Sequence, residues 1–276
     1  MFRTSNPTLR NPYFSGTGGQ AAADVALLGG MQRGVSGAPA RVNHMTMQGT
    51  VNKTAFLLAL CVASALGGWT LVGNNPALLM PMWLVGALGG LVLVLIACFK
   101  PTTSPIVAPL YAIAQGGFVG GISWVFAKSF AKPGGAMNTD LVFNAALLTF
   151  GILGGLLAAY SFRLIRPNKL FYNVVITGTI GAALYGLIAM VFGMFGNFSL
   201  ASVYDPNNGG MVSVGFSVLL VVLASANLVL DFDQIEMGVR NQAPRHMEWF
   251  GGMSLLVTLV WLYIEVLRLL AKLRRD

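Results

Sequence analysis

The stretch Leu230-Asp231-Phe232-Asp233-Gln234-Ile235-Glu236 puts three carboxylates directly after a long apolar run, residues 211–230. A further carboxylate, Glu265, lies inside the next apolar run, residues 250–270. Each run has the ~20 residues that a helix needs to cross a bilayer. Ionisable side chains are costly inside a membrane and are usually kept there for function or for pairing. The functional hypothesis therefore depends on whether the carboxylates of residues 231–236 and Glu265 lie close together in the fold.

The composition excludes an ordinary soluble domain. Of 276 residues, 55% are hydrophobic and 9% are charged, whereas soluble domains carry about 25% charged residues. The mean hydropathy is +0.71. The net charge of +8 would favour nucleic-acid binding only if the basic residues formed a patch. They fall between the apolar runs and at the ends, where they act as topology signals, so no nucleic-acid partner is expected.

Seven apolar runs predict an all-α integral membrane protein with seven transmembrane helices. The runs are about twice as long as a barrel strand and do not alternate, which excludes a β-barrel. Glycine pairs four residues apart predict close helix packing. The runs are residues 54–72, 82–99, 106–126, 141–162, 172–195, 211–230 and 250–270, and the glycine pairs are 86/90, 116/120, 117/121 and 151/155.

Residues 1–50 differ from the rest of the chain and predict a disordered, basic, cytoplasmic tail before a membrane domain over residues 51–276. Their content is polar and low in complexity, with several arginines and one acidic residue, Asp24. Basic residues are divided eleven to six between the two sides of a seven-span topology. The positive-inside rule then places the N-terminus in the cytoplasm.

Asp231 and Glu265 are the main candidates for a site. If the sixth helix continues to Arg240, Asp231 lies some nine residues inside it, or roughly 13 Å. A midpoint at position 248, in the connection, would put the two carboxylates of the antiparallel helices at similar depth. Arg268, three residues after Glu265, could instead neutralise Glu265 within its own helix.

Two other polar residues, Asp233 and Gln115, have both a functional and a structural interpretation. Asp233 is either a further ion contact or a solvated carboxylate at the interface, and Glu236 is four residues before Arg240, a spacing that suits a surface ion pair. Gln115, in the third run, either lines a cavity or forms an interhelical hydrogen bond. Pro105, Pro109 and the glycines around Gln115 predict a kinked third helix.

These motifs resemble the transmembrane Bax inhibitor motif family, bacterial branch. The segments that carry the resemblance are residues 230–236, Leu262-Tyr263-Ile264-Glu265, Ser104-Pro105 through Leu110-Tyr111, Gly116 to Ser123, and Ser5-Asn6-Pro7 with Phe14. The resemblance implies seven helices with the last helix central and wrapped by the other six. It also implies a calcium leak of the bacterial inner membrane, controlled by two aspartates on the last two helices. Asp231 and Glu265 occupy those positions, with Glu in place of the usual Asp, and Gln115 stands where the family often has an acidic residue.

The resulting hypothesis is a pH-sensitive cation leak with calcium as the transported ion, no resident cofactor, and membrane lipids as surroundings. Two close carboxylates cannot both ionise cheaply, so they would titrate as a coupled unit and latch the helices together. A weak calcium contact at Asp231 and Glu265 would suit a hard cation. The alternative is a regulatory protein without transport that binds, for example, a membrane protease. An enzyme is not expected, because the Gly-x-Gly-Asp of intramembrane aspartyl proteases is replaced by Leu262-Tyr263-Ile264-Glu265.

Overall fold

The computed structural model describes residues 44–131, 135–194, 205 and 210–274. Seven helical segments in these ranges are long and apolar enough to cross a membrane, which confirms the predicted all-α membrane fold. The described residues contain no strand, only an isolated bridge between His44 and Pro244. The helices are α2 (Met47–Asn74), α3 (Leu79–Leu84) and α4 (Gly90–Phe99) within the second span, α5 (Ser104–Ser129), α6 (Thr139–Ser161), α7 (Lys169–Met194), α8 (Met211–Arg240) and α9 (Met247–Leu273).

The helix ends follow local chemistry. The Thr46 hydroxyl accepts a hydrogen bond from the Gly49 amide and caps α2, and the Asn138 side chain caps α6 by accepting from the Leu141 amide. Such caps satisfy amides that have no partner inside the helix. Gln242, with a φ of 51°, and Pro244 separate α8 from α9, because neither a left-handed residue nor a proline continues a helix.

The predicted boundary of the tail needs a correction. Residues 1–43 of the predicted tail lie outside the described residues, but α2 already begins at Met47, four residues before residue 51, where the membrane domain was predicted to start. The Thr46 cap explains the earlier start. The Met45 side chain is buried and its amide donates to the Ala243 carbonyl at 2.7 Å, so the residues just before α2 are held against the connection between α8 and α9.

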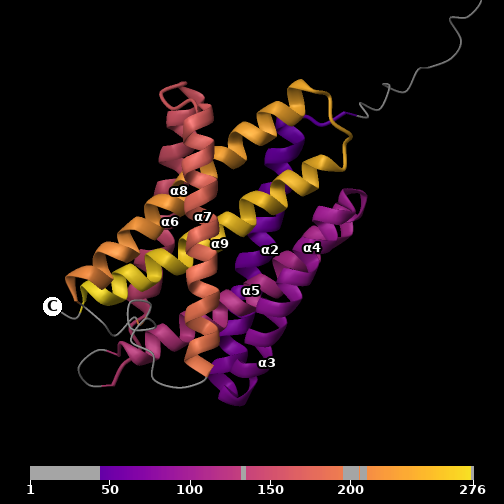
Figure 1. Cartoon of the computed structure of the whole chain (residues 1–276). Helices are drawn as coiled ribbons and strands as arrows, with labels where there is room; N and C mark the ends of the chain where they lie inside the picture. The colour runs from indigo at the N-terminus through magenta and orange to yellow at the C-terminus, as the bar shows by residue number, and fades with distance from the viewer. Residues whose placement is uncertain (1–43, 132–134, 195–204, 206–209, 275–276) are drawn as a thin grey trace, which may run out of the picture. The chain divides into compact units, whose positions relative to one another are not determined.

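Helix α9 is the central element, as the family resemblance implies, but four of the other six spans rather than all six are its main neighbours. Its principal neighbours are α2, α5, α6 and α8, while α4 packs on α5 and α7 packs on α8. Figure 1 shows α9 running beside α8 and across α2 and α5. In the most apolar 18-residue stretch of α9, 56% of the residues are buried, whereas 6% are buried in the corresponding stretch of α7. The buried apolar side chains form two clusters. Helix α9 contributes Leu259 and Val266 to one cluster and Leu256 and Val260 to the other, so it joins the two parts of the core.

The glycine pairs of α5 let two backbones approach closely. A Cβ at Gly116 would lie 2.3 Å from the Cys61 carbonyl oxygen, and one at Gly120 would lie 2.1 Å from the Ala65 carbonyl oxygen. This is the small-residue packing expected between membrane helices. The same expectation is wrong for Gly151 and Gly155, because no described atom of another segment lies within 4 Å of a Cβ built at either.

Candidate functional site

Asp231 lies on the face of α8 that packs against α9. Its side chain is buried, and its two carboxylate oxygens accept separate hydrogen bonds, from the Ser254 hydroxyl at 2.7 Å and from the Thr258 hydroxyl at 2.6 Å. Both donors are on α9, one helical turn apart. A carboxylate in an apolar interior is tolerated when its oxygens are satisfied in this way. We call the contact of Asp231 with Ser254 and Thr258 the α8–α9 latch.

Glu265 is also buried but has a different partner. Both of its oxygens accept hydrogen bonds from Nη1 of Arg268, at 2.9 and 2.8 Å, one turn later on the same helix. The predicted pair of Asp231 with Glu265 is therefore wrong: the two carboxylates have separate partners. The alternative that Arg268 neutralises Glu265 is the arrangement observed.

The error comes from the register of the two helices. Asp231 lies nine residues before Arg240, the end of α8, and nine residues after Met247, the start of α9, is position 256. Position 256 lies between Ser254 and Thr258, the observed partners. Glu265 lies nine residues further, or roughly 14 Å along the axis at 1.5 Å per residue. The predicted midpoint at position 248 came from the two acidic residues themselves rather than from the helix ends.

The polar residues of α9 form a line that faces α8. Ser254, Thr258, Glu265, Arg268 and Lys272 are separated by four, seven, three and four residues, which places them on one helical face. Among the described residues, Lys272 is fully buried and donates to the Ser213 carbonyl at 3.1 Å and to the Ser217 hydroxyl at 2.8 Å. Ser254, Thr258 and Lys272 were not among the predicted site residues, although this spacing indicates all three.

Asp233 belongs to a different contact, on the side of α8 that faces α6 and α7. Its carboxylate accepts from the Tyr160 hydroxyl at 3.2 Å and from the Tyr172 hydroxyl at 2.5 Å. Glu236 accepts from Tyr160 at 2.5 Å and pairs with Arg240, as predicted. Asp233 is thus a half-buried carboxylate with partners on α6 and α7, and it supports the packing of these helices on α8.

Gln115 forms an interhelical hydrogen bond, which was one of its two predicted roles. Its buried amide donates to the Gly86 carbonyl at 3.1 Å. Gly86 is part of a π-helical turn, η4 (Val85–Gly89), inside the second span. The Gly86 carbonyl also accepts from the Gly90 amide, so the Gln115 bond is an additional contact that ties α5 to this irregular turn. The second span therefore contains an irregular turn that was not predicted, and α5 includes Pro109 within its helical range.

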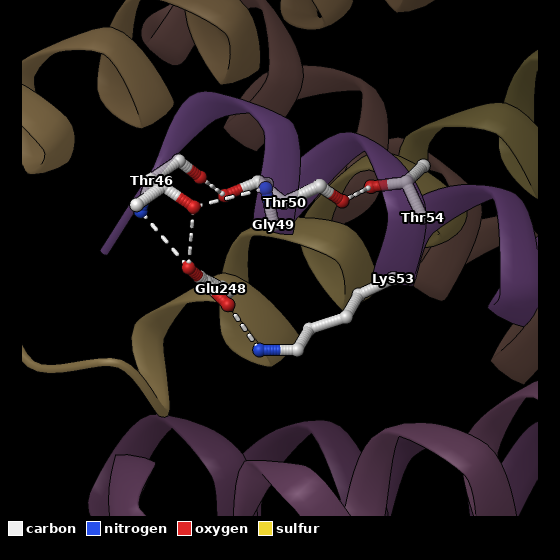
Figure 2. Close-up of polar contacts among 6 residues, drawn as sticks. All are labelled: Thr46, Gly49, Thr50, Lys53, Thr54 and Glu248. Atoms are coloured by element: carbon white, nitrogen blue, oxygen red, sulfur yellow. Dashed lines mark hydrogen bonds and ion pairs between the residues drawn. The ribbon is translucent and has the colours of Figure 1, made fainter. Parts of the chain in front are cut away.

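A third buried carboxylate, Glu248, joins the start of α9 to the start of α2 (Figure 2). One oxygen accepts from the Thr46 amide and hydroxyl, both at 2.9 Å, and the other pairs with the Lys53 ammonium. A Cβ at Gly49 would collide with this carboxylate. The sequence analysis missed the site because an acidic residue in the first turn of a helix is common and suits the helix dipole.

The described residues contain no group of three or more His, Cys, Asp or Glu side chains that could hold a metal ion. Asp231 and Glu265 do not form a common ligand pair either, because each carboxylate is bound by its own partners. What the arrangement provides is a set of buried polar contacts that hold α9 against α8 and α2.

A family model described as Bax inhibitor 1 like matches residues 6–275. The chain belongs to the Bax inhibitor 1-like family. No curated protein and no solved structure matched the chain. In this Bax inhibitor 1-like chain, the last helix is the central one and carries the partners of a buried acidic residue on the preceding helix.

Proposed function

We propose that this Bax inhibitor 1-like protein is a pH-dependent cation leak, favouring calcium, that the α8–α9 latch holds closed. The observation that carries the proposal is the buried Asp231 carboxylate, bound on both oxygens by hydroxyls of the central helix inside a membrane span. Family membership supports it. The sensor differs from the predicted pair: it is one carboxylate and two hydroxyls.

The latch predicts whether the leak increases or decreases as the pH falls. An ionised carboxylate only accepts hydrogen bonds, and bonds to a charged acceptor are roughly twice as strong as neutral ones. Protonation of Asp231 removes the charge and turns one oxygen into a donor, so both contacts to α9 weaken. As pH falls, α8 and α9 therefore separate more readily, and the leak increases.

Apolar side chains on α8 explain a closed resting state. Leu220, Ala224 and Leu228 are buried and lie between Ser217 and Asp231 on the face of α8 toward α9. These apolar side chains cover the polar face of α9 between its two ends, so no continuous polar path for ions forms between α8 and α9. When the helices separate, the carboxylates of Asp231 and Glu265 would supply the oxygen ligands that hard divalent cations prefer.

The proposed membrane is the bacterial inner membrane, with the N-terminus in the cytoplasm. The eleven-to-six division of basic residues supports this orientation. An impermeant thiol reagent should label Asn208→Cys, between α7 and α8, in intact cells and should not label Arg245→Cys, between α8 and α9. The reverse pattern of labelling would invert the orientation.

The direct test is calcium flux into liposomes that contain only this protein, measured from mildly alkaline to mildly acidic pH. The parent should leak more as pH falls, and Asp231→Asn should leak at every pH, because a neutral amide cannot accept both bonds with the strength of a carboxylate. Asp233→Asn is the matched control, and it should keep the parent's pH profile.

Two outcomes of this flux test would contradict the proposal. If Asp231→Asn keeps the parent's profile, the latch is not the pH sensor. If the parent shows no flux at any pH, the protein is no leak, and the regulatory alternative with a partner such as a membrane protease becomes the better account.

A further inference from the structure

An apolar cavity of about 250 Å³ lies between α2, α5, α6 and α9. Val62 and Phe150 are exposed side chains on its α2 and α6 walls, and Leu256 and Leu259 are buried side chains on its α9 wall. The cavity therefore extends from the outer surface of two membrane spans to the central helix.

The hydroxyl groups on the cavity wall are already satisfied by protein partners. Ser123 and Tyr263 hydrogen-bond to each other through their hydroxyls at 2.7 Å, and Thr149 donates to the Ala145 carbonyl at 2.8 Å. The rest of the lining is apolar apart from the Cys61 thiol and the indole N–H of Trp69. No headgroup or water is recognised here, since apolar cavities of this kind stay dry and take apolar ligands.

The position in the membrane defines what meets the opening. The wall residues lie in the middle parts of α2 and α9, residues 58–69 and 256–263, so the opening faces the hydrocarbon of the bilayer. An empty cavity loses dispersion contacts, and one larger than the ~150 Å³ that binds benzene can hold a flexible hydrocarbon segment.

We propose that this cavity binds one acyl chain of a membrane phospholipid, which inserts between α2 and α6 and contacts the buried side of α9. Leu256, Leu259 and Tyr263 are spaced by three and four residues and form one face of α9, while Ser254 and Thr258 of the latch lie on another. The bound chain supports α9 from the side away from α8.

The test uses phosphatidylcholine vesicles that contain a phospholipid with a photoreactive diazirine near the end of one acyl chain. After illumination, mass spectrometry should find adducts on Leu256 or Leu259 in addition to the exposed positions of α2 and α6. Bulk lipid cannot reach those two side chains, which are 1% and 4% exposed, so adducts there require insertion of the chain.

Two variants fill the cavity from different walls, and a neighbour provides the control. Ala146→Phe and Val62→Phe should each reduce the adducts on α9 to background, while Leu147→Phe, an exposed α6 position outside the lining, should not. Melting temperatures verify that each variant folds. If only one of the two filling variants folds, that variant alone is enough to test the proposal. Adducts confined to exposed positions in the parent, or adducts on α9 that persist in a folded filling variant, would overturn the proposal.

Discussion

Glu248 is a buried carboxylate whose charge is balanced by the Lys53 ammonium. Its side chain is 3% exposed and that of Lys53 is 17% exposed. Lys53→Met should lower stability by roughly 3 kcal/mol, because it leaves a buried charge without its counter-ion. Glu248→Gln should cost less, since the amide oxygen can still accept from Thr46 and Lys53 can reach water. Thermal unfolding in detergent measures both.

The double variant separates lost charge pairing from lost packing. Lys53→Met combined with Glu248→Gln should be more stable than Lys53→Met alone, because the buried charge is gone. If the double variant is the less stable of the two, the contact acts through packing rather than through charge, and the pairing shown in Figure 2 is not its basis.

At the scale of single residues, sequence reasoning found the important side chains better than their partners. Asp231, Glu265, Gln115 and Arg268 are all buried or partly buried polar groups of the core, as their position inside or directly after apolar runs suggested. Their partners depend on the register between helices. A shift of nine residues along α9 makes the hydroxyls of Ser254 and Thr258, rather than Glu265, the partners of Asp231. A short polar connection gives no local signal for such a register.

At the scale of helices, close packing of α5 on α2 gives a prediction with an internal control. Gly120→Ala should lower the melting temperature, because its Cβ would overlap the Ala65 carbonyl oxygen, and overpacking typically costs ~1–3 kcal/mol. Gly151→Ala on α6 meets no described atom of another segment and should be neutral or stabilising by up to about 1 kcal/mol through helix propensity. Equal effects of the two substitutions would contradict the packing.

The same comparison shows what spacing can and cannot predict for an element. The seven spans follow from hydropathy and length, which depend only on the local sequence. Two glycines four residues apart look alike on α5 and α6, but only a facing helix makes them a packing site. The π turn at Val85–Gly89 had no counterpart in the sequence analysis, since the proline and glycine signals were stronger in α5.

For the whole molecule, the ordered domain should need the residues just before α2 but not those further upstream. Deleting residues 1–43 should leave the melting temperature unchanged. Deleting residues 1–46 should lower it, because the Met45 amide contact to Ala243 and the Thr46 contacts to Glu248 are lost. A large loss with the shorter deletion would show that residues 1–43 contribute to the stability of the fold.

The central claim is that α8 must separate from α9 at the latch for ions to pass, and a reversible cross-link tests it most directly. A Cβ at Gly251 would lie 3.1 Å from Cγ1 of Ile235, one turn from Asp231. In a background without Cys61 and Cys98, Ile235→Cys with Gly251→Cys should form a disulfide, and Thr179→Cys with Asn227→Cys, between α7 and α8, is the control. Calcium flux at acidic pH should stop when the first pair is oxidised and return on reduction, while the control pair leaks in both states. Undiminished acidic flux through the oxidised 235–251 pair would contradict the account.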